Sequence, residues 1–412
     1  MKIFVKTFGC TFNKRDSEII KGVLSTNQFE IVDSEEKADI IVVNSCGVKD
    51  QTQSKIIFYI ESLNKPVYLG GCLPKILDLK NIKNVKGVFD TNTINNLPNQ
   101  INGEIKELFS SKKLNKLELP VQQDSKDTLI IQISEGCLGD CNYCATKFAR
   151  GKLKSYSISD IVNAIKGFKG TRVNLTSQDT GCYGFDIDTN LAKLLKVLIN
   201  LPGQFKIRIG MMNPNHLINF KDEFLEVFKS NKIFKFVHLP VQAGNDEVLK
   251  AMNRKYKVKD FISLVKEIKE NFFRVTIATD IIIGFPGETD EQHWDTLNLL
   301  RDLSPEVVNI SKYWPRPKTK AAELKPLPTE VIKHRSKIIT DICKNISSLQ
   351  NERWLNWEGE VIIDEKGKEE NQWIGRNSSY KSVIINGNYK LGQILRINVM
   401  KTTDWDLRGK VI

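Results

Sequence analysis

The chain has 412 residues, of which 41% are hydrophobic and 27% charged, a balance typical of a folded globular protein and unlike that of a disordered one. This length predicts two or three domains with buried cores, and no stretch reaches the roughly 18 apolar residues of a membrane span. The chain opens without a cleavable apolar leader, so we expect a cytoplasmic protein without a membrane anchor. The formal net charge of +12 indicates a polyanionic partner, although basic residues often form only a solvated face.

The first hundred residues alternate short apolar runs with polar helical segments. We predict strands at Lys2–Thr7, Asp39–Asn44, Pro66–Gly70 and Gly87–Phe89. Helices are expected at Lys14–Ser25 and Gln51–Leu63. Strands separated by helices predict a parallel-sheet α/β domain over residues 1–100, covered on both faces. The polar stretch 101–127 is predicted to be a linker.

The same alternation continues at greater length through residues 128–349. Strand candidates are TLIIQI, RVNLT, FKIRIG, FKFVHLP, RVTIATDIII and EVVNIS. The helical segments among them are Ile158–Phe168, Asn190–Leu201, Phe220–Ser230, Val258–Glu270 and Asp290–Asp302, and a further helix at Thr329–Gln350 ends the block. Six strand-plus-helix units predict a partial (β/α)6 barrel and argue against a closed eight-fold barrel.

Residues 350–412 lose helical periodicity. WEGEVIIDE, QWIGRN, YKSVIING and QILRINVMKT are typical of short strands broken by Gly and Asn, which predicts a small all-β barrel. Four of the six tryptophans lie here, namely Trp354, Trp357, Trp373 and Trp405. Their rings could stack on RNA bases or fill the small core, and the sequence leaves both readings open.

Three of the eight cysteines, Cys137, Cys141 and Cys144, are spaced C-x3-C-x2-C directly after a predicted barrel strand. Zinc sites usually take four ligands in two pairs, whereas three thiolates leave one iron of a [4Fe–4S] cluster open to another ligand. The loop belongs to the C-terminal mouth of the barrel, where such folds place their chemistry. The spacing therefore favours an iron–sulfur cluster.

A second group, Cys10, Cys46 and Cys72, follows three predicted strands of the N-terminal sheet. The C-terminal ends of parallel strands share one edge, so these thiols can converge there. The alternative is that each is a small buried hydrophobic residue at a strand end. Cys182 and Cys343 are read as ordinary residues without a ligand role.

The motif GCLGDCNYC, with Tyr143 before its last cysteine, resembles the signature of the radical S-adenosylmethionine (SAM) enzymes. TFGCTFNKRDSE, NSCGVKDQTQSK and GGCLPK resemble the N-terminal domain of the methylthiotransferases, a family that joins this domain to a radical SAM barrel and a TRAM β-barrel. The resemblance implies that Cys137, Cys141 and Cys144 hold a SAM-cleaving [4Fe–4S] cluster. It also implies that Cys10, Cys46 and Cys72 hold a second [4Fe–4S] cluster, which carries the transferred sulfur.

The resemblance further implies a SAM and substrate pocket at the barrel mouth. Its expected residues are Tyr143, Gln178, Arg208, Gln242, Ile283 and Gly284. Structural roles remain the alternative, for example an internal ion pair for Arg208 or a turn at Gly284. No residue is assigned as catalytic.

The positive charge is unevenly distributed, with a net of +2 over residues 1–100, +9 over 101–349 and +1 over 350–412. Basic residues in the barrel loops, and Arg376 and Lys381 in the TRAM-like module, are candidates for contacting an RNA backbone. The full set of candidates is Lys147, Arg150, Lys152, Arg254, Lys255, Arg316, Arg376 and Lys381.

TFGCTFN and SQDTGCYG look most like the branch that modifies N6-threonylcarbamoyladenosine at tRNA position 37. This resemblance implies sulfur insertion and methylation at adenine C2, with the tRNA anticodon loop, a flavodoxin- or ferredoxin-type electron donor and a sulfur source as partners. We expect a monomer. The alternatives are a ribosomal-protein aspartate or isopentenyl-adenosine substrate, and a non-catalytic iron–sulfur RNA-binding protein.

Overall fold

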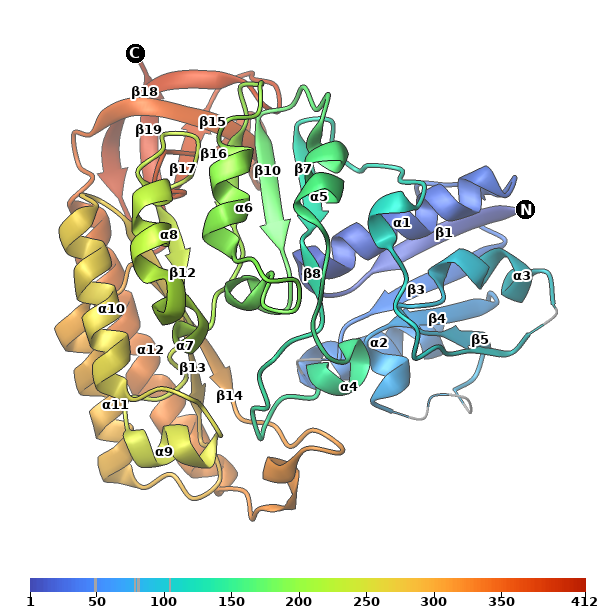
Figure 1. Cartoon of the computed structure of the whole chain (residues 1–412), viewed down its shortest axis with the longest axis horizontal. Coiled ribbons are helices and arrows are strands. Elements are labelled where there is room, and N and C mark those ends of the chain that lie inside the picture. The colour runs from blue at the N-terminus through green and yellow to red at the C-terminus, as the bar shows by residue number, and fades with distance from the viewer. Residues whose placement is uncertain (48–49, 78, 80–81, 104) are drawn as a thin grey trace.

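The computed structural model describes residues 1–47, 50–77, 79, 82–103 and 105–412, which form three units in chain order (Figure 1). The predicted α/β class, with a partial barrel and a C-terminal all-β barrel, is confirmed. Val48 and Lys49, inside the NSCGVKDQTQSK motif, lie outside the described residues. No helix in the described part of the chain is long and apolar enough to cross a bilayer.

The N-terminal unit is a six-stranded parallel sheet in the order β2-β1-β3-β4-β5-β6. Its strands are β1 (Lys2–Thr7), β2 (Glu30–Ile31), β3 (Ile40–Ser45), β4 (Val67–Gly71), β5 (Val85–Phe89) and β6 (Glu107–Leu108). Its helices are α1 (Thr11–Thr26), α2 (Asp50–Ser62) and α3 (Leu97–Ile101). Every residue of β3 is buried, as expected of a central parallel strand with apolar clusters on both faces.

The segment predicted as a linker is part of the folded structure. It adds β6 to the sheet edge and forms a 3-10 turn at Lys116–Glu118, whose Lys116 side chain is fully buried. Residues 120–124 then run along α1, where the Gln122 amide donates to the Glu18 carbonyl at 3.0 Å. The path to the barrel is therefore fixed by contacts with the N-terminal unit.

Six parallel strands form the open barrel, as two three-stranded sheets. They are β7 (Thr128–Gln132), β10 (Arg172–Thr176), β11 (Lys206–Ile209), β12 (Phe236–His238), β13 (Thr276–Ile283) and β14 (Val307–Lys312). The short strands β8 (Ser134–Glu135) and β9 (Lys154–Ser155) pair beside β7. A bridge between Ile207 and Ile233 lies where the two sheets meet.

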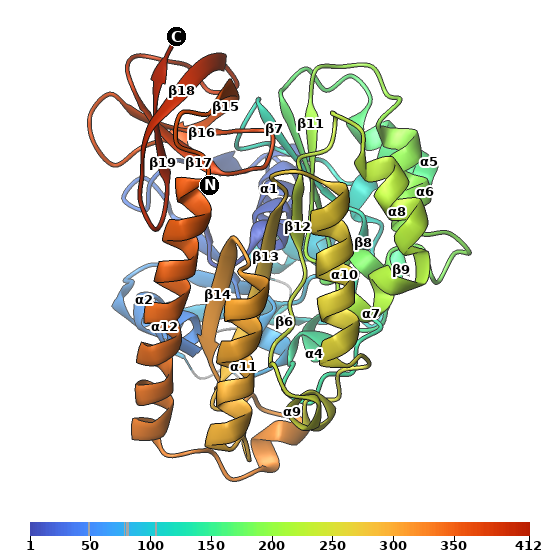
Figure 2. The ribbon, with the colours of Figure 1, turned by 90° about the vertical axis from the view of Figure 1, so that its left-hand side faces the viewer.

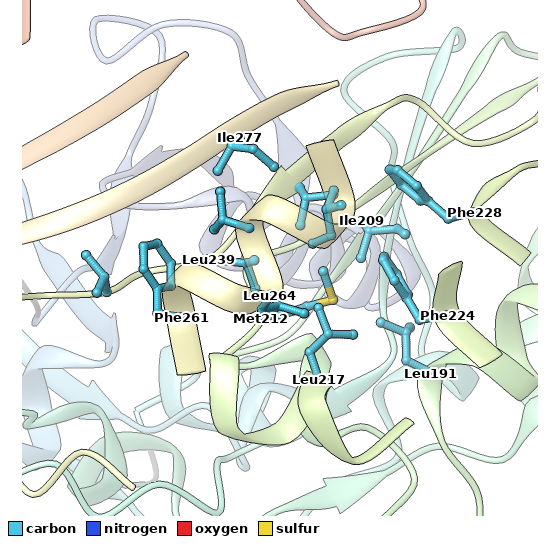
Figure 3. Packing of buried hydrophobic residues seen from close by; sticks show 14 of the residues in the cluster. Leu191, Ile209, Met212, Leu217, Phe224, Phe228, Leu239, Phe261, Leu264 and Ile277 are labelled. Carbon is cyan, nitrogen blue, oxygen red and sulfur yellow. The ribbon is translucent and has the colours of Figure 1, made fainter. Parts of the chain in front are cut away.

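The helices of this unit are α4 (Thr146–Arg150), α5 (Ile158–Ile165), α6 (Leu191–Leu198), α7 (Pro214–Leu217), α8 (Lys221–Phe228), α9 (Asp246–Ala251), α10 (Val258–Asn271), α11 (Asp290–Leu303) and α12 (Thr329–Glu352). The long helices cover the outside of the barrel, whereas α4 packs against the N-terminal unit. Alternate strand residues such as Ile209 and Ile277 meet apolar helix residues such as Phe228 and Leu264 in the main core (Figure 3). The other side of each strand, carrying residues such as Asn174 and His238, is left for the barrel interior.

The C-terminal unit is a closed five-stranded barrel in the order β15-β16-β17-β19-β18. Its strands are β15 (Glu358–Lys366), β16 (Gln372–Arg376), β17 (Ser382–Asn386), β18 (Ile394–Thr402) and β19 (Leu407–Val411). Trp354 and Trp373 are buried in its core, whereas Trp405 is 76% exposed. Core packing, one of the two readings left open, therefore accounts for Trp354 and Trp373.

This small barrel sits at the N-terminal ends of the large barrel's strands, above the end of α12 (Figure 2). Arg172 at the start of β10 pairs with Asp364, and Tyr380 packs against Phe234 and Phe236. The C-terminal strand ends, with the Cys137–Cys144 loop, lie at the opposite end of the large barrel.

Candidate active site

The loop after β8 gathers the thiols of Cys137, Cys141 and Cys144. A Cβ atom added at Gly139 would lie 3.2 Å from the Cys137 Sγ and 3.8 Å from the Cys141 Sγ, so both sulfurs flank this glycine. The Gly139 amide donates to the Cys137 Sγ at 3.1 Å, and Arg254 Nη1 donates to the Cys141 Sγ at 3.3 Å. Burial, helped by the neighbouring thiols, raises the pKa of Cys144.

Cys182 is placed closer to this group than the sequence indicated. Its Sγ, the Cys137 Sγ and a carboxylate oxygen of Asp179 all lie within 4.8 Å of one another, and Cys182 is fully buried. A hydrogen bond from Cys182 lowers the pKa of Cys137 and raises that of Cys182 itself. Cys343, by contrast, lies half-buried on α12 against the barrel core.

The second group lies at the C-terminal edge of the N-terminal sheet, after β1, β3 and β4. A Cβ atom at Gly9 would lie 2.9 Å from the Cys46 Cβ, and one at Gly47 would lie 3.5 Å from the Cys72 Cβ. A larger residue at Gly9 would therefore crowd Cys46, whereas one at Gly47 would be in ordinary contact with Cys72 and would clash with the Ile76 side chain. Cys46 and Cys72 are buried, and Cys10 is exposed at the start of α1.

Helix α4 lies between the two cysteine groups. It begins two residues after Cys144, and its Ala149 packs with the preceding Ala145 against Cys72 and Ile76 of the N-terminal unit. The loop after β14 also reaches this unit, because Arg316 donates to Gln53 at 2.9 Å and Lys318 donates to the Lys75 carbonyl at 3.1 Å. The barrel mouth and the cysteine edge of the sheet are therefore held together by direct contacts.

Four buried charges join the units beneath α4: Asp16, Lys116, Glu135 and Arg150. Lys116 Nζ lies 2.9 Å from a carboxylate oxygen of Asp16 and of Glu135. Arg150 Nη1 lies 2.7 Å from Asp16 and 2.9 Å from Glu135. Burial alone would raise the pKa of both carboxyls, but the two cations hold each pKa below its ordinary value.

The donor sets fit iron–sulfur clusters. Each group offers three sulfurs, the number that leaves one iron of a cubane open to another ligand. Three of the sulfurs accept hydrogen bonds, Cys137 from the Gly139 amide, Cys141 from Arg254 and Cys72 from Arg150. Such hydrogen bonds would stabilise the thiolate form over the thiol.

Several of the residues expected to hold SAM surround the mouth. Gln178 accepts from the Gly136 amide at 2.6 Å, so it ties the base of the cysteine loop to the end of β10. Tyr143 lies beside Arg254 and the thiols, and burial raises its pKa well above the ordinary value. Gln242 takes a positive φ of 74°, and its backbone bridges to Ile281 on β13.

Two of the residues expected to contact SAM, Ile283 and Gly284, do not present a side chain to the mouth. Ile283 is 1% exposed and packs in the barrel core, so its side chain does not face the mouth. The Gly284 amide donates to Glu288 at 3.0 Å, and a Cβ there would lie 2.6 Å from the Ile332 Cγ1. A SAM contact at this position would be made by backbone atoms.

Arg208 faces the barrel interior, with its guanidinium 5.1 Å from the Phe236 ring and 5.5 Å from the Tyr380 ring. Among the described residues, no carboxylate pairs with it, so the internal ion pair weighed as an alternative is not formed. Nearby, His238 and Asn309 both bond to Asp280 Oδ1, at 2.9 and 2.8 Å. The inward-facing side of these strands thus carries polar and charged side chains.

Most of the basic residues predicted to contact RNA make hydrogen bonds or ion pairs within the protein. Arg150, Arg316 and Lys381 are buried, and for these three the prediction of a surface contact is wrong, because their cations serve internal hydrogen bonds. Arg254 is tied to Cys141, and Arg376 to Asp364. Lys147, Lys152 and Lys255 reach solvent, although Lys147 pairs with Asp140.

Sequence reasoning missed the buried charges Asp16, Lys116 and Glu135. A usable signal existed, since Asp16 follows Cys10 by six residues and Glu135 precedes Cys137 by two. Lys116 had no such signal because it lies in a polar stretch far from either motif. Its pairing depends on how the segment folds back between the units.

Comparison with known proteins follows the three units. Residues 2–91 match an uncharacterised protein family, UPF0004, residues 131–300 match the radical SAM superfamily, and residues 358–412 match the TRAM domain. The chain is 40% identical over 413 residues to the probable threonylcarbamoyladenosine tRNA methylthiotransferase of Pyrococcus abyssi, covering 96% of each chain. The chain belongs to the threonylcarbamoyladenosine branch of the methylthiotransferase family.

Other relatives of this family extend the match. The human threonylcarbamoyladenosine tRNA methylthiotransferase is 31% identical over 430 residues, covering all of this chain and 74% of the human one. Among solved structures, the radical SAM methyltransferase TsrM from Kitasatospora setae with tryptophan and a SAM analogue has a TM-score of 0.56 at 13% identity. That match covers 78% of this chain and 75% of TsrM, and it supports the fold alone.

Proposed function

We propose that this methylthiotransferase inserts sulfur at adenine C2 of N6-threonylcarbamoyladenosine at tRNA position 37, and methylates it, in the cytoplasm. The observation that carries the proposal is the meeting of two three-cysteine groups across α4, at the mouth of a radical SAM barrel. The relatives at 31–40% identity bear the name of this nucleoside and of tRNA.

In this proposal Cys137, Cys141 and Cys144 hold one [4Fe–4S] cluster and Cys10, Cys46 and Cys72 hold the other. When bound, the first would supply the electron that cleaves SAM to a 5′-deoxyadenosyl radical, and the second would carry the sulfur.

The chain's own residues hold and enclose these groups. Arg254 and the Gly139 amide donate to the sulfurs of the barrel loop, and Gln178 fixes the base of that loop. Tyr143, Gln242 and the backbone at Gly284 border the space proposed for SAM. The N-terminal unit, through α4 and the loop after β14, covers the mouth and limits access of water to a radical.

The exposed Lys152 and Lys255 and the half-buried Lys147 are proposed to receive the anticodon-loop backbone, with the adenine flipped toward the mouth. A flavodoxin- or ferredoxin-type donor and a sulfur source complete the reaction. The protein is proposed to act as a monomer.

The test uses the full-length protein reconstituted with iron and sulfide. It should bind about eight irons, and replacing Cys137, Cys141 and Cys144 together should leave about four. Incubation with SAM, a reductant and tRNA that carries threonylcarbamoyladenosine should yield its methylthio derivative by mass spectrometry of digested nucleosides.

Two controls separate the alternatives. Transfer RNA with isopentenyl-adenosine, and ribosomal protein, should remain unmodified. Product formed on either one would show that it is the substrate instead. SAM left uncleaved under reduction, together with tight tRNA binding, would support a non-catalytic RNA-binding protein.

A further inference from the structure

Arg150 is a buried cation that touches both the barrel and the second cysteine group. It ends α4, six residues after Cys144, and it is 3% exposed. Its Nε donates to the Cys72 Sγ at 3.3 Å, while its Nη1 pairs with Asp16 and Glu135. A single side chain from the SAM-cleaving loop therefore reaches a proposed ligand of the other cluster.

The hydrogen bond from Arg150 to Cys72 is not needed to neutralise the buried carboxylates. Asp16 and Glu135 carry two negative charges, and Lys116 with Arg150 supplies two positive ones. Lys116 makes its ion pairs to the same two carboxylates without reaching a sulfur. The ammonium group of Lys116 is thus sufficient as a buried counter-charge to these carboxylates. The contact with Cys72 needs a further N–H that points in another direction, and the guanidinium of Arg150 provides it.

Neighbouring groups fix the plane of that guanidinium. The Phe12 ring centroid lies 4.6 Å from the Arg150 Cζ, and Arg150 Nη2 donates to Asn13 Oδ1 at 3.5 Å. Asn13 Oδ1 in turn accepts from the Cys10 Sγ at 3.6 Å. Arg150 therefore contacts Cys72 directly and connects to Cys10 through one amide.

We propose that Arg150 is a positioning residue for the second cluster, holding the Cys72 thiolate and raising the reduction potential of that cluster. The proposal rests on the proposed function, because it requires a cluster on Cys10, Cys46 and Cys72. Hydrogen bonds and positive charge at the ligand sulfurs favour the more negative, reduced cluster. Since Arg150 and Cys144 share one short segment, the same contact fixes the second cluster relative to the SAM-cleaving loop.

The experiment isolates the second cluster by using the full chain with Cys137, Cys141 and Cys144 replaced by alanine. This parent is compared with the same protein carrying Arg150→Lys, which keeps the positive charge but not the Nε–H geometry. Iron content, thermal melting and a dye-mediated redox titration followed by electron paramagnetic resonance are measured. We expect about four irons in the parent, and a more negative potential or loss of iron with Arg150→Lys.

The matched control is Lys116→Met in the same parent, which disturbs the same carboxylates without touching a sulfur. If that variant does not fold, Thr91→Val takes its place, because Thr91 Oγ1 donates only to Glu135 within the buried network. An unchanged potential with Arg150→Lys, or an equal shift in the control, would overturn the role of Arg150 while leaving the cluster in place. A parent without iron would overturn the proposed second cluster, and the inference with it.

Discussion

Basic side chains close together in the sequence occupy very different environments in the structure. The sequence motif predicted three cysteines at the barrel mouth, and the structure gathers their thiols there. The same reasoning grouped Arg150 with solvent-facing lysines because both are basic and near the motif. Only the fold distinguishes them, since α4 turns Arg150 inward against Asp16 and leaves Lys152 exposed.

Cys182 offers a test at this scale. Replacing it with alanine should leave the iron content of the reconstituted protein at about eight, because three thiolates suffice for a cubane with one open iron. Losing one buried sulfur should lower the free energy of unfolding by about 1–2 kcal/mol. Iron analysis and urea denaturation check both points, with Cys343→Ala as the control. Loss of about four irons with Cys182→Ala alone would instead make it a ligand of the barrel cluster.

The exposed lysines make a second residue-scale prediction. Lys152→Ala and Lys255→Ala should each weaken tRNA binding, because each removes a cation proposed to face the phosphate backbone. Each should also reduce the slope of log K against log salt by about 0.7. Binding measured at several salt concentrations checks this, with Lys196→Ala on the outer face of α6 as a control. Equal effects in all three variants would contradict a defined RNA path.

At the scale of elements, periodicity located the long strands and helices and missed what depends on tertiary closure. Predicted and observed bounds agree at β1 and differ by one or two residues at β3 to β5. Helix α1 begins three residues before its predicted start, since its N-cap, Cys10, makes no capping hydrogen bond and gave no signal. Strand β19 was missed because LRGKV is short and has a glycine at its centre, and its pairing with β17 and β18 on either side holds it in place.

The attachment of α12 to the C-terminal barrel leads to a pH prediction. Lys381 Nζ donates to Asn351 on α12 at 2.7 Å, and burial lowers the pKa of Lys381 to about 8. Unfolded, the same lysine titrates near 10.5. Between these values the unfolded chain keeps a proton that the folded chain has lost, so stability rises with pH.

The gain should reach about 3 kcal/mol from pH 8 to 10.5, at about 1.4 kcal/mol for each pKa unit. Lys381→Met has no such proton to lose, so the wild type should gain stability relative to it over this range. Urea unfolding followed by tryptophan fluorescence measures the difference, and Lys401→Met at an exposed position of β18 serves as the control. A difference independent of pH would contradict a neutralised Lys381.

At the scale of the whole molecule, the three units are joined by contacts that the sequence did not indicate. The small barrel closes the N-terminal end of the large one through Asp364 and Tyr380, and the N-terminal unit covers the other end through α4. RNA gripped by both the small barrel and the mouth lysines would therefore have to extend along the large barrel. Such junctions are formed by isolated residues whose partners lie far away in the sequence, so no local pattern predicts them.

Gly22 tests whether the segment between the first two units acts as a joint. It lies on α1, and a Cβ there would stand 2.3 Å from the Pro120 carbonyl oxygen, a backbone atom. An alanine normally favours a helix by about 1 kcal/mol over glycine, so Gly22→Ala would stabilise an unencumbered α1. Here the backbone must move, and we expect a net destabilisation of about 1–3 kcal/mol. Ser54→Ala, at an exposed position of α2, should change stability little.

Because residues 120–124 lead directly into β7, Gly22→Ala should also loosen the contact of α4 with the N-terminal unit, which hydrogen exchange at residues 145–150 would detect. Full stability with unchanged exchange would mean that this segment follows α1 without fixing the two units.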